Sequence, residues 1–400
     1  MSVSRRAVLQ GLALAPWARA GASEVCAEKA PALTVEDAEV FRVKVNQRGN
    51  WTIVRLNTSG GVTGIGDASQ SFNDDQTLVY VKQFAELLRG QSIFAVEWLR
   101  KATAATVAAQ GRPAAMAASA LEQCLWDIQG KAFGVPVYDL FGGRIQERIR
   151  MYANINRSTD ERTPEGFARM AEKAVGASFD AVKLAPFDAM PPGLTDEGQV
   201  ERFMARGIAC AAAVRQTIGA TRDLLVDVHS RMDLEHGLEL VRRFEPLKLY
   251  WIEEVTPAKP VESLARINKA ATMQTAGGES IHGVRGFYPY IKAEAVDIVM
   301  PDVKVCGGMI ELKKIAGLAE GAGLIASPHG PASPVGNLTA AHVIATVTNF
   351  NILEFSYGEV PWRAELLDPP EEIVDSALVL TDRPGLGHML NEKTAAKYAV

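Results

Sequence analysis

Three acidic residues recur at one interval along the chain. Asp227, Glu253 and Glu279 each close a short apolar run, and 26 residues separate each acid from the next. The first two runs, 224–227 and 250–253, are rich in aliphatic and aromatic residues and are typical of strands, while the third is less apolar. Helical patterns fill the gaps between the runs. A strand and a helix repeated at this interval predict βα units and a parallel sheet.

Carboxylates at the ends of three successive strands also constrain the function. One acid at such a position is usually a helix cap or a solvated loop residue, but three in register are harder to explain in that way. In a closed (β/α)8 barrel the C-terminal strand ends surround the active site. Three converging carboxylates need a cation to offset their repulsion, and an all-oxygen ligand set suits Mg2+, with Mn2+ as the alternative. We therefore expect these acids to form a divalent-metal site.

Eight strands are expected in the second half of the chain. Helical patterns such as 165–175, 201–218 and 310–320 alternate with them. Eight strands over about 205 residues have the size of a (β/α)8 barrel, which we place at 149–355. The predicted strands are 149–155, 180–185, 223–229, 249–253, 273–278, 296–301, 323–327 and 351–355.

The residues before and after the predicted barrel have different patterns. From Leu33 to Asp67 the chain is strand-like, and from 114 to 132 it is a strong, alanine-rich helix. Residues 33–145 are therefore expected to form an α+β domain. Residues 356–400 contain four prolines and look irregular, and we expect them to fold back onto that domain.

The first 22 residues have the features of a bacterial export signal. Arg5 and Arg6 are followed by a weakly apolar stretch from Gly11 to Pro16 and by small residues suited to cleavage at 18–22. This pattern predicts twin-arginine export to the periplasm, a route that carries folded proteins and suits an enzyme that binds its metal before export. The alternative is a cytoplasmic protein with a disordered or misassigned start.

Composition limits the partners. The net charge of −5 argues against nucleic acid and anionic membranes, and no apolar run of 18 residues predicts a transmembrane helix. The four cysteines have neither CxxC spacing nor a regular pattern, so we interpret them as single buried thiols rather than a disulfide framework or a zinc site. They are Cys26, Cys124, Cys210 and Cys306.

Other reactive side chains follow the predicted strands. Residues two apart on a strand share a face, so His229 is expected to point into the same barrel mouth as Asp227. Glu254 faces the opposite way from Glu253 and is expected to lie behind the ligands or in solvent. Lys183 lies near the end of the second predicted strand.

An Asp–His pair is expected at the ends of the sixth and seventh strands. Asp302 and His329 would form a dyad in which the carboxylate fixes the imidazole tautomer and raises its basicity, as a general base requires. A divalent ion can hold a substrate carboxylate and stabilise the enediolate formed when His329 removes the neighbouring C–H proton. His229 would then donate the proton that drives loss of a β-hydroxyl.

These motifs resemble those of the enolase superfamily, in its mandelate racemase and muconate lactonizing enzyme branch. The resemblance extends from Leu33 to the C-terminus and implies an N-terminal capping domain over a modified barrel. Each motif alone is weak, but together they are highly specific. They are ALEQCLWDIQGKAFGVPVYDLFGG (120–143), VKLAPFD (182–188), VDVH (226–229), WIEE (251–254), GGES (277–280), MPDVKVCGG (300–308) and SPHGPASPVGN (327–337).

The resemblance also implies roles for individual residues. It implies the same three Mg2+ ligands and the same His–Asp base as the strand ends do. It adds Glu354, which would hydrogen-bond the substrate carboxylate or the enediolate. Lys183 matches the first lysine of the family's Lys-x-Lys pair and would polarise the substrate carboxylate. A small-molecule carboxylate substrate and a homo-oligomer are implied as well.

One departure from the family pattern bears on the reaction. Ala185 replaces the second lysine of the racemases, which disfavours a two-base racemase because alanine cannot accept a proton. His229, two residues after Asp227, resembles the general acid of sugar-acid dehydratases such as the galactonate enzymes. The resemblance therefore favours loss of water from a polyhydroxy acid, which gives a 2-keto-3-deoxy acid.

Other functions and the substrate are less constrained. A cycloisomerase acting on a sugar-acid lactone, or an epimerase with Lys183 as second base, would share the same first half-reaction. A binding protein that has lost catalysis is disfavoured because the ligands and the base are intact. Within the family the capping-domain loops largely set substrate identity, and here we expect them around 47–51 and 67–75. Arg48 or Arg231 could meet a distal group of the substrate, although either could also be a solvated surface arginine.

Overall fold

The computed structural model describes residues 32–400 except for 48, 70–72 and 331. Residues 33–400 form one unit. The predicted export signal at 1–22 and Cys26 therefore lie outside the described residues, as does Arg48. The other three cysteines are buried free thiols, as predicted. No helix in the described part of the chain is both long and apolar enough to cross a membrane.

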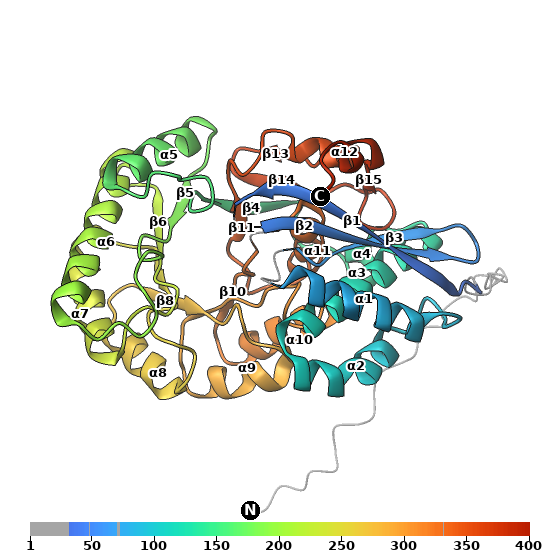
Figure 1. The fold of residues 1–400 in the computed structure, drawn as a ribbon, viewed down its shortest axis with the longest axis horizontal. Coiled ribbons are helices and arrows are strands. Elements are labelled where there is room, and N and C mark those ends of the chain that lie inside the picture. Colours follow the sequence, from blue (N-terminus) through green and yellow to red (C-terminus); the bar gives the residue numbers. More distant parts are fainter. Residues whose placement is uncertain (1–31, 48, 70–72, 331) are drawn as a thin grey trace, which may run out of the picture. The chain divides into compact units, whose positions relative to one another are not determined.

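An antiparallel sheet and three long helices make up the N-terminal part (Figure 1). Its elements are β1 (Val35–Asn46), β2 (Gly49–Thr58), β3 (Thr63–Asp67), α1 (Asp74–Leu88), α2 (Val96–Gln110) and α3 (Arg112–Phe133). Two glycines let β3 lie directly on α3. A Cβ atom would be 2.2 Å from the Cys124 carbonyl oxygen at Gly64 and 2.1 Å from the Ala120 carbonyl oxygen at Gly66. The predicted strands and the alanine-rich helix are confirmed.

Eight parallel strands form the barrel, as predicted. They are β4 (Arg148–Asn154), β5 (Ala181–Leu184), β6 (Asp223–Asp227), β7 (Trp251–Glu253), β8 (Gln274–Gly277), β9 (Ile298–Val299), β10 (Ile325–Ala326) and β11 (Leu353–Ser356). They pair in chain order from β4 to β10, and β11 pairs with β4. The Ala326 N–H donates to the Asn349 carbonyl at 3.0 Å, which joins β10 to the segment before β11.

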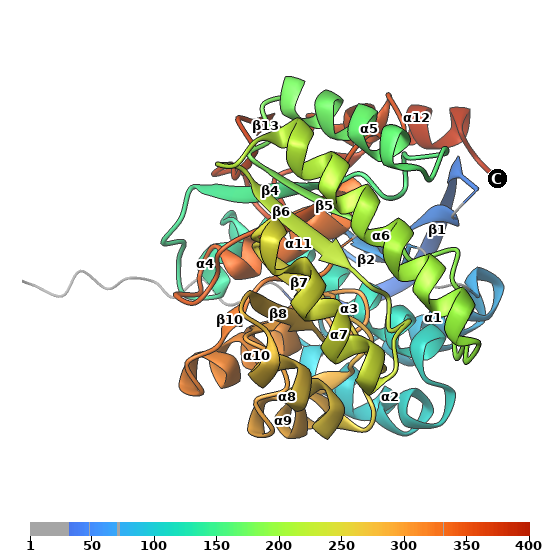
Figure 2. The same ribbon diagram turned by 90° about the vertical axis from the view of Figure 1, so that its left-hand side faces the viewer.

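Seven helices connect these strands. They are α5 (Pro164–Gly176), α6 (Glu197–Ile218), α7 (Leu234–Phe244), α8 (Val261–Ala270), α9 (Gly283–Lys292), α10 (Met309–Gly321) and α11 (Pro334–Ile344). Figure 2 shows α5, α6, α7 and α8 in succession along the outside of the strands. In α7, Asp233 caps the first turn and Leu240, Val241 and Phe244 form the buried stripe. Among the described residues, β11 leads to a short 3-10 turn, η2 (Arg363–Leu366), where a regular barrel has a helix.

An apolar layer fills the barrel below the acidic strand ends. Leu225 and Trp251 lie two residues before Asp227 and Glu253, so each shares a strand face with one of these acids. The rings of Tyr152 and Trp251 pack edge to face, with 5.4 Å between the ring centres. The layer consists of Tyr152, Ala181, Leu225, Trp251, Ala276, Ile298, Met300 and Ile352. It separates the acids from the other end of the barrel.

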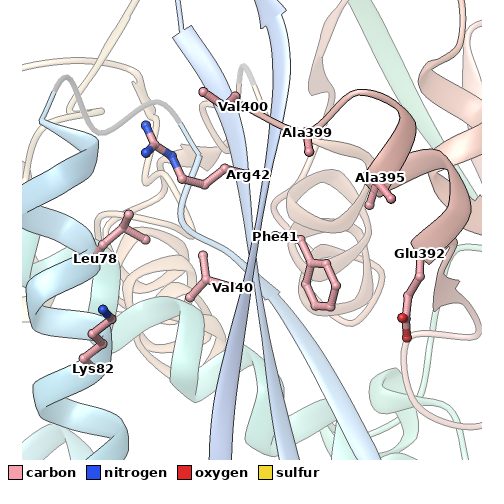
Figure 3. A pocket seen from close by; sticks show the side chains of 10 residues that line it. Val40, Phe41, Arg42, Leu78, Lys82, Glu392, Ala395, Ala399 and Val400 are labelled. Carbon is pink, nitrogen blue, oxygen red and sulfur yellow. The ribbon is translucent and has the colours of Figure 1, made fainter.

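The C-terminal segment contacts both parts of the fold. β14 (Ala377–Val379) pairs antiparallel with β4 and with β13 (Ile373–Val374), an extension of the barrel sheet that the sequence did not predict. The segment around α12 (Glu392–Lys397) lies against β1, where the Lys44 N–H donates to the Tyr398 carbonyl at 2.8 Å. A hollow of about 490 Å³ is lined by β1, α1 and the end of the chain. Figure 3 shows the side chains around it.

Candidate active site

The three acids predicted to bind a metal lie together. Asp227 and Glu253 are the last residues of β6 and β7 and pair with each other in the register of the two strands. Glu279 follows the C-terminal end of β8. One carboxylate oxygen from each acid lies within 4.8 Å of the other two. Asp227 and Glu253 are buried while Glu279 is partly exposed, so solvent reaches the cluster at Glu279.

The chain turns sharply after β6 and β7. His229, Ser230 and Glu254 have positive φ angles of 50°, 57° and 42°, a conformation that costs on the order of 1 kcal/mol or more for a side chain other than glycine. The Ser230 hydroxyl donates to the Glu254 carboxylate at 3.3 Å. Burial, with the charges of Glu279 and Asp227, raises the pKa of Glu254 to about 8. Glu254 therefore lies near the three acids and is partly exposed.

The donor set fits a divalent cation. Glu279 Oε2 is buried and, although His329 Nε2 lies 3.0 Å away, no contact of hydrogen-bond geometry reaches it from the described residues. The Lys183 ammonium lies 2.7 Å from Glu253 and 3.3 Å from Asp227, which offsets only part of the charge of the cluster. The three carboxylates offer oxygen ligands alone, and Mg2+ prefers such ligands. These residues can therefore hold a hard divalent ion.

Asp302 and His329 form the pair that the sequence predicted. Asp302 follows β9 and His329 follows β10, and the imidazole Nδ1–H donates to Asp302 Oδ2 at 2.9 Å. Burial favours the neutral acid, but Lys304 (3.4 Å away) and His329 outweigh it and hold the pKa of Asp302 below its usual range. The ionised carboxylate thus fixes the tautomer that leaves Nε2 as the proton acceptor.

The Nε2 atom of His329 faces the acid cluster. It lies 3.0 Å from Glu279 Oε2 and 3.8 Å from Glu354 Oε2. Burial lowers the pKa of His329, but the charges of Glu279 and Glu354 and the hydrogen bond to Asp302 raise it above its usual value overall. A basic imidazole therefore adjoins the exposed member of the cluster.

His229 contacts a different acid of the cluster. Its Nε2 is 3.1 Å from Asp227 Oδ2, and its Nδ1 contacts Asp188 Oδ1. Arg162 and Asn156 each donate to Asp188 at 3.1 Å. Burial lowers the pKa of His229, but Asp227 and Asp188 raise it well above its usual value. Sequence reasoning missed Asp188, because it lies in the irregular loop after β5, where no periodicity relates it to His229.

Lys183 lies buried among carboxylates. Besides its contacts with Glu253 and Asp227, its Nζ is 3.4 Å from Glu354 and 5.6 Å from the centre of the Tyr152 ring. Burial lowers the pKa of Lys183, but the surrounding carboxylates raise it well above its usual value. Lys183 is therefore a fixed cation in this arrangement rather than a free base.

Glu354 on β11 is held beside the loop that carries His329. One oxygen accepts from the Asn154 amide at 2.6 Å and the other from the Gly330 N–H at 2.9 Å. Burial raises the pKa of Glu354, but Lys183 and His329 outweigh it and lower the pKa to about 2. The structure thus brings the predicted metal ligands and the other predicted catalytic residues into one cluster. These others are His329, Asp302, His229, Lys183 and Glu354.

The chain matches two protein families over most of its length. The mandelate racemase / muconate lactonizing enzyme N-terminal domain matches residues 31–142, and the enolase C-terminal domain-like family matches residues 166–394. The chain belongs to the enolase superfamily. Members of this superfamily are enzymes that bind a divalent metal, so Asp227, Glu253 and Glu279 are the candidate ligands.

Curated relatives in this superfamily include several dehydratases. A D-galactonate dehydratase from Ralstonia nicotianae is 31% identical over 349 residues, which cover 86% of this chain and 89% of the relative. A D-gluconate dehydratase from Thermoproteus tenax is 28% identical over 352 residues, which cover 86% of this chain and 69% of the relative.

Solved structures have the same fold. A mandelate racemase/muconate lactonizing enzyme-like protein from Rubrobacter xylanophilus superposes with a TM-score of 0.84 at 30% identity, covering 92% of this chain and 98% of that protein. A mandelate racemase/muconate lactonizing enzyme from Sulfitobacter has a TM-score of 0.84 at 26% identity, and the match covers 92% of this chain and 96% of that protein.

The residues expected to determine which substrate binds differ in their exposure and in their contacts. Those that the structure describes include Gln47, Asp67 and Arg231. The Gln47 amide donates to Asp160 at 3.4 Å. Asp67 is fully buried and bonds other protein groups, so it does not face a substrate. Arg231 is partly exposed, and its Nε is buried with no hydrogen-bond partner among the described residues. Arg231 therefore stays a candidate for contacting a distal substrate group.

Proposed function

We propose that the protein is a Mg2+-dependent acid-sugar dehydratase. It would remove the proton next to the carboxylate of a polyhydroxy acid and then eliminate the β-hydroxyl as water, giving a 2-keto-3-deoxy acid. The relatives named as dehydratases of D-gluconate, D-xylonate and D-galactonate support this class of substrate. Because their names cover three different sugar acids, the proposal concerns the class and not one member of it.

This proposal rests on two imidazole rings, each of which contacts a different acid of the cluster. His329 Nε2 lies 3.0 Å from Glu279, and His229 Nε2 lies 3.1 Å from Asp227. Each ring has an aspartate at its Nδ1, which orients the ring and supports a positive charge on it. Elimination of a β-hydroxyl needs a base for the C–H proton and an acid for the leaving oxygen. Two separately held imidazoles can supply both.

Asp227, Glu253 and Glu279 would hold the Mg2+ ion. When bound, the ion supplies a Lewis acid that stabilises the negative charge growing on the substrate carboxylate. Lys183, joined to the same cluster, would bind the substrate carboxylate or the enediolate with its ammonium. Glu354 would hydrogen-bond the same group as the protonated acid, a form that the negative charge of the arriving substrate favours. Their contact of 3.4 Å holds both side chains in place before substrate arrives.

His329 would act first. Its Nε2 takes the proton from the carbon next to the carboxylate, and the electron pair of the C–H bond moves into the enediolate. Asp302 at Nδ1 stabilises the imidazolium that forms. His229 would act second, as its Nε2 protonates the β-oxygen while the C–O bond breaks and the oxygen leaves as water. The enol product then takes a proton at the β-carbon and becomes the keto acid.

Lys183 bears on the alternative of epimerisation. An epimerase would need a second base for the opposite face of the substrate, and Ala185 cannot serve. Lys183 has its ammonium among three carboxylates and is 1% exposed. This favours elimination over epimerisation.

The test is a screen of the purified protein with Mg2+ against aldonic, uronic and aldaric acids. Keto acid is detected with semicarbazide, and α-proton exchange is followed by NMR in D2O. We expect keto acid from at least one polyhydroxy acid, and a chelator should stop both keto-acid formation and exchange. Exchange without keto acid would favour an epimerase, and a product from sugar-acid lactones alone would favour a cycloisomerase.

Assembly and location are proposed with the function. We propose a homo-oligomer that binds a small-molecule carboxylate and no nucleic acid or membrane, and that reaches the periplasm by the twin-arginine route. Light scattering on the purified protein tests the oligomer. Cell fractionation of a strain with Arg5 and Arg6 changed to Lys tests the export, because loss of the periplasmic protein is expected only if these arginines are read as a signal.

A further inference from the structure

The loop that carries Asp302 is held at its far end by an acid of the N-terminal part. Glu122 of α3 is 3% exposed, and its carboxylate accepts the N–H groups of Met309 at 2.8 Å and Ile310 at 3.0 Å. These are the first residues of α10, whose N-cap is Gly308 and therefore has no side chain that could accept them. Glu122 thus supplies the cap that α10 lacks.

The loop that carries His329 is held in the same manner. Asp67 at the end of β3 is 0% exposed, and its Oδ2 accepts the N–H of Ser333 at 3.0 Å and the hydroxyl of Ser333 at 2.7 Å. Ser333 is the N-cap of α11. A Cβ atom on Gly336 would lie 2.4 Å from the same Asp67 oxygen, so the close approach of α11 depends on a glycine there.

We call Glu122 and Asp67 the anchors of the two loops. The residues that they hold lie close to Asp302 and His329 along the chain. Residues 302–308 connect Asp302 to the start of α10, and the Asp302 carbonyl accepts the N–H groups of Val305 at 2.9 Å and Cys306 at 2.7 Å. His329 and Ser333 are only four positions apart. Segments as short as these transmit a displacement of their ends, so the contacts of Glu122 and Asp67 bear on where Asp302 and His329 lie.

The two anchors are also joined to each other. The Asp67 N–H donates to the side-chain oxygen of Gln123 at 2.8 Å, and Gln123 is the neighbour of Glu122 on α3. A single turn of α3 therefore connects both loops. Asp302 and His329 contact each other at 2.9 Å across the gap between these loops.

We propose that Asp67 and Glu122 are positioning residues for the base, holding the two loops so that Asp302 and His329 meet in the productive geometry. The catalytic meaning of this inference rests on the proposed function, in which His329 is the base. The positioning itself can be measured without a substrate. A misplacement of about 1 Å at a catalytic group can lower the rate by about 100-fold.

The test variants are Asp67→Asn and Glu122→Gln. Each keeps the size of the side chain but replaces one acceptor oxygen with an NH2 group that faces N–H donors. Ser333→Ala is a milder variant, since it keeps the backbone bond from the Ser333 N–H to Asp67. It removes the hydroxyl, which donates to Asp67 and accepts the Gly336 N–H at 3.5 Å as the N-cap of α11. Asp127→Asn is the matched control. Asp127 is also a buried acid of α3, but it accepts the N–H groups of Ile65 at 3.0 Å and Leu386 at 2.8 Å, which belong to neither loop.

The first measurement is the distance between His329 Nδ1 and Asp302 Oδ2 in crystal structures of the variants. We expect it to lengthen beyond hydrogen-bonding range in Asp67→Asn and Glu122→Gln and to stay unchanged in Asp127→Asn. The second is α-proton exchange at saturating substrate and Mg2+. We expect kcat to fall about 10- to 100-fold in the two loop variants and less in Ser333→Ala. KM and Mg2+ affinity should stay within about twofold, because the metal ligands are not in these loops.

Two results would overturn the inference. One is an unchanged His329–Asp302 contact in the loop variants, and the other is an equal loss of kcat in Asp127→Asn. If the wild-type protein exchanges no proton from any acid in the screen, the proposed function fails, but the crystallographic distances still decide the positioning. If Glu122→Gln does not fold, Asp67→Asn and Ser333→Ala give the same comparison.

Discussion

At the scale of single residues, His329 is expected to be needed for proton removal and not for the metal. Because its ring contacts Glu279 without belonging to the acid cluster, His329→Asn should leave Mg2+ affinity within about threefold. Loss of a general base costs about 10²- to 10⁴-fold, so α-proton exchange should fall by that factor. Mn2+ binding followed by EPR checks the metal site, and NMR in D2O checks exchange. Exchange at the wild-type rate would rule out His329 as the base.

His229 is expected to act after His329. His229→Asn should keep α-proton exchange, because the base is intact, and should lose keto-acid formation by about 10²-fold or more. Both rates can be read from one NMR experiment on the same sample. Asp188→Asn gives a graded comparison, since it leaves the His229 ring in place and removes the negative charge beside Nδ1. Normal dehydration by His229→Asn would contradict the assignment of the acid.

The residues that could be found from the sequence are those fixed by strand ends. Asp227 and Glu253 were predictable because strand periodicity and the parallel register put them side by side. Asp188 could not be found, because it comes from an irregular loop and meets His229 only in three dimensions. The three ion pairs of Lys183 were also missed, since they depend on how deeply its side chain is buried.

At the scale of elements, the start of α10 is expected to depend on Gly308. This residue has φ of 90°, and a Cβ atom there would lie 2.2 Å from Glu122 Oε2. Gly308→Ala combines backbone strain with the loss of the Glu122 cap, and we expect it to lower the free energy of unfolding by about 3 kcal/mol. Gly317→Ala in the same helix has open space around the new methyl group and should raise it by about 0.5 to 1 kcal/mol. Urea unfolding measures the free energy of unfolding of both variants. Equal free energies for Gly308→Ala and Gly317→Ala would contradict the prediction.

Elements with a clear period were predictable, and elements held by other elements were not. The eight barrel strands and helices such as α5 follow hydrophobic periodicity. β13 and β14 were missed although β9 and β10 are equally short, because the repeat of strand and helix gives the positions of β9 and β10 and no such repeat surrounds β13 and β14. The cap of α10 was missed for a related reason: its sequence begins with glycine, and the acceptor comes from α3, almost two hundred residues earlier in the chain.

At the scale of the whole molecule, His342 joins distant segments. It lies on α11 and accepts the Tyr138 N–H at Nδ1, at 3.2 Å, while its Nε2–H donates to the Leu386 carbonyl at 3.3 Å. The Tyr138 ring stacks on the His342 ring, with 5.3 Å between the ring centres. The barrel, the segment after α3 and the C-terminal segment therefore meet at one buried imidazole, which must be neutral to accept the Tyr138 bond.

This contact makes the stability of the fold depend on pH. Burial lowers the pKa of His342 from 6.5 to about 4 in the folded protein. Between these values the unfolded chain binds a proton that the folded chain does not, so the free energy of unfolding falls as the pH drops from 6.5 towards 4. At pH 5 this group alone should remove about 2 kcal/mol relative to pH 8. Above about pH 7.5 its contribution to the free energy of unfolding is constant.

His342→Gln isolates this effect from that of the many carboxylates. The variant should be less stable than the wild type at pH 8, because a stacked ring and one hydrogen bond are lost. The difference between the two proteins should shrink by about 2 kcal/mol at pH 5, since only the wild type has the titrating imidazole. Urea unfolding of both proteins at the two pH values measures this change. Parallel pH dependence in the two proteins would mean that His342 does not stay neutral in the fold, and that the junction of the three segments does not depend on its tautomer.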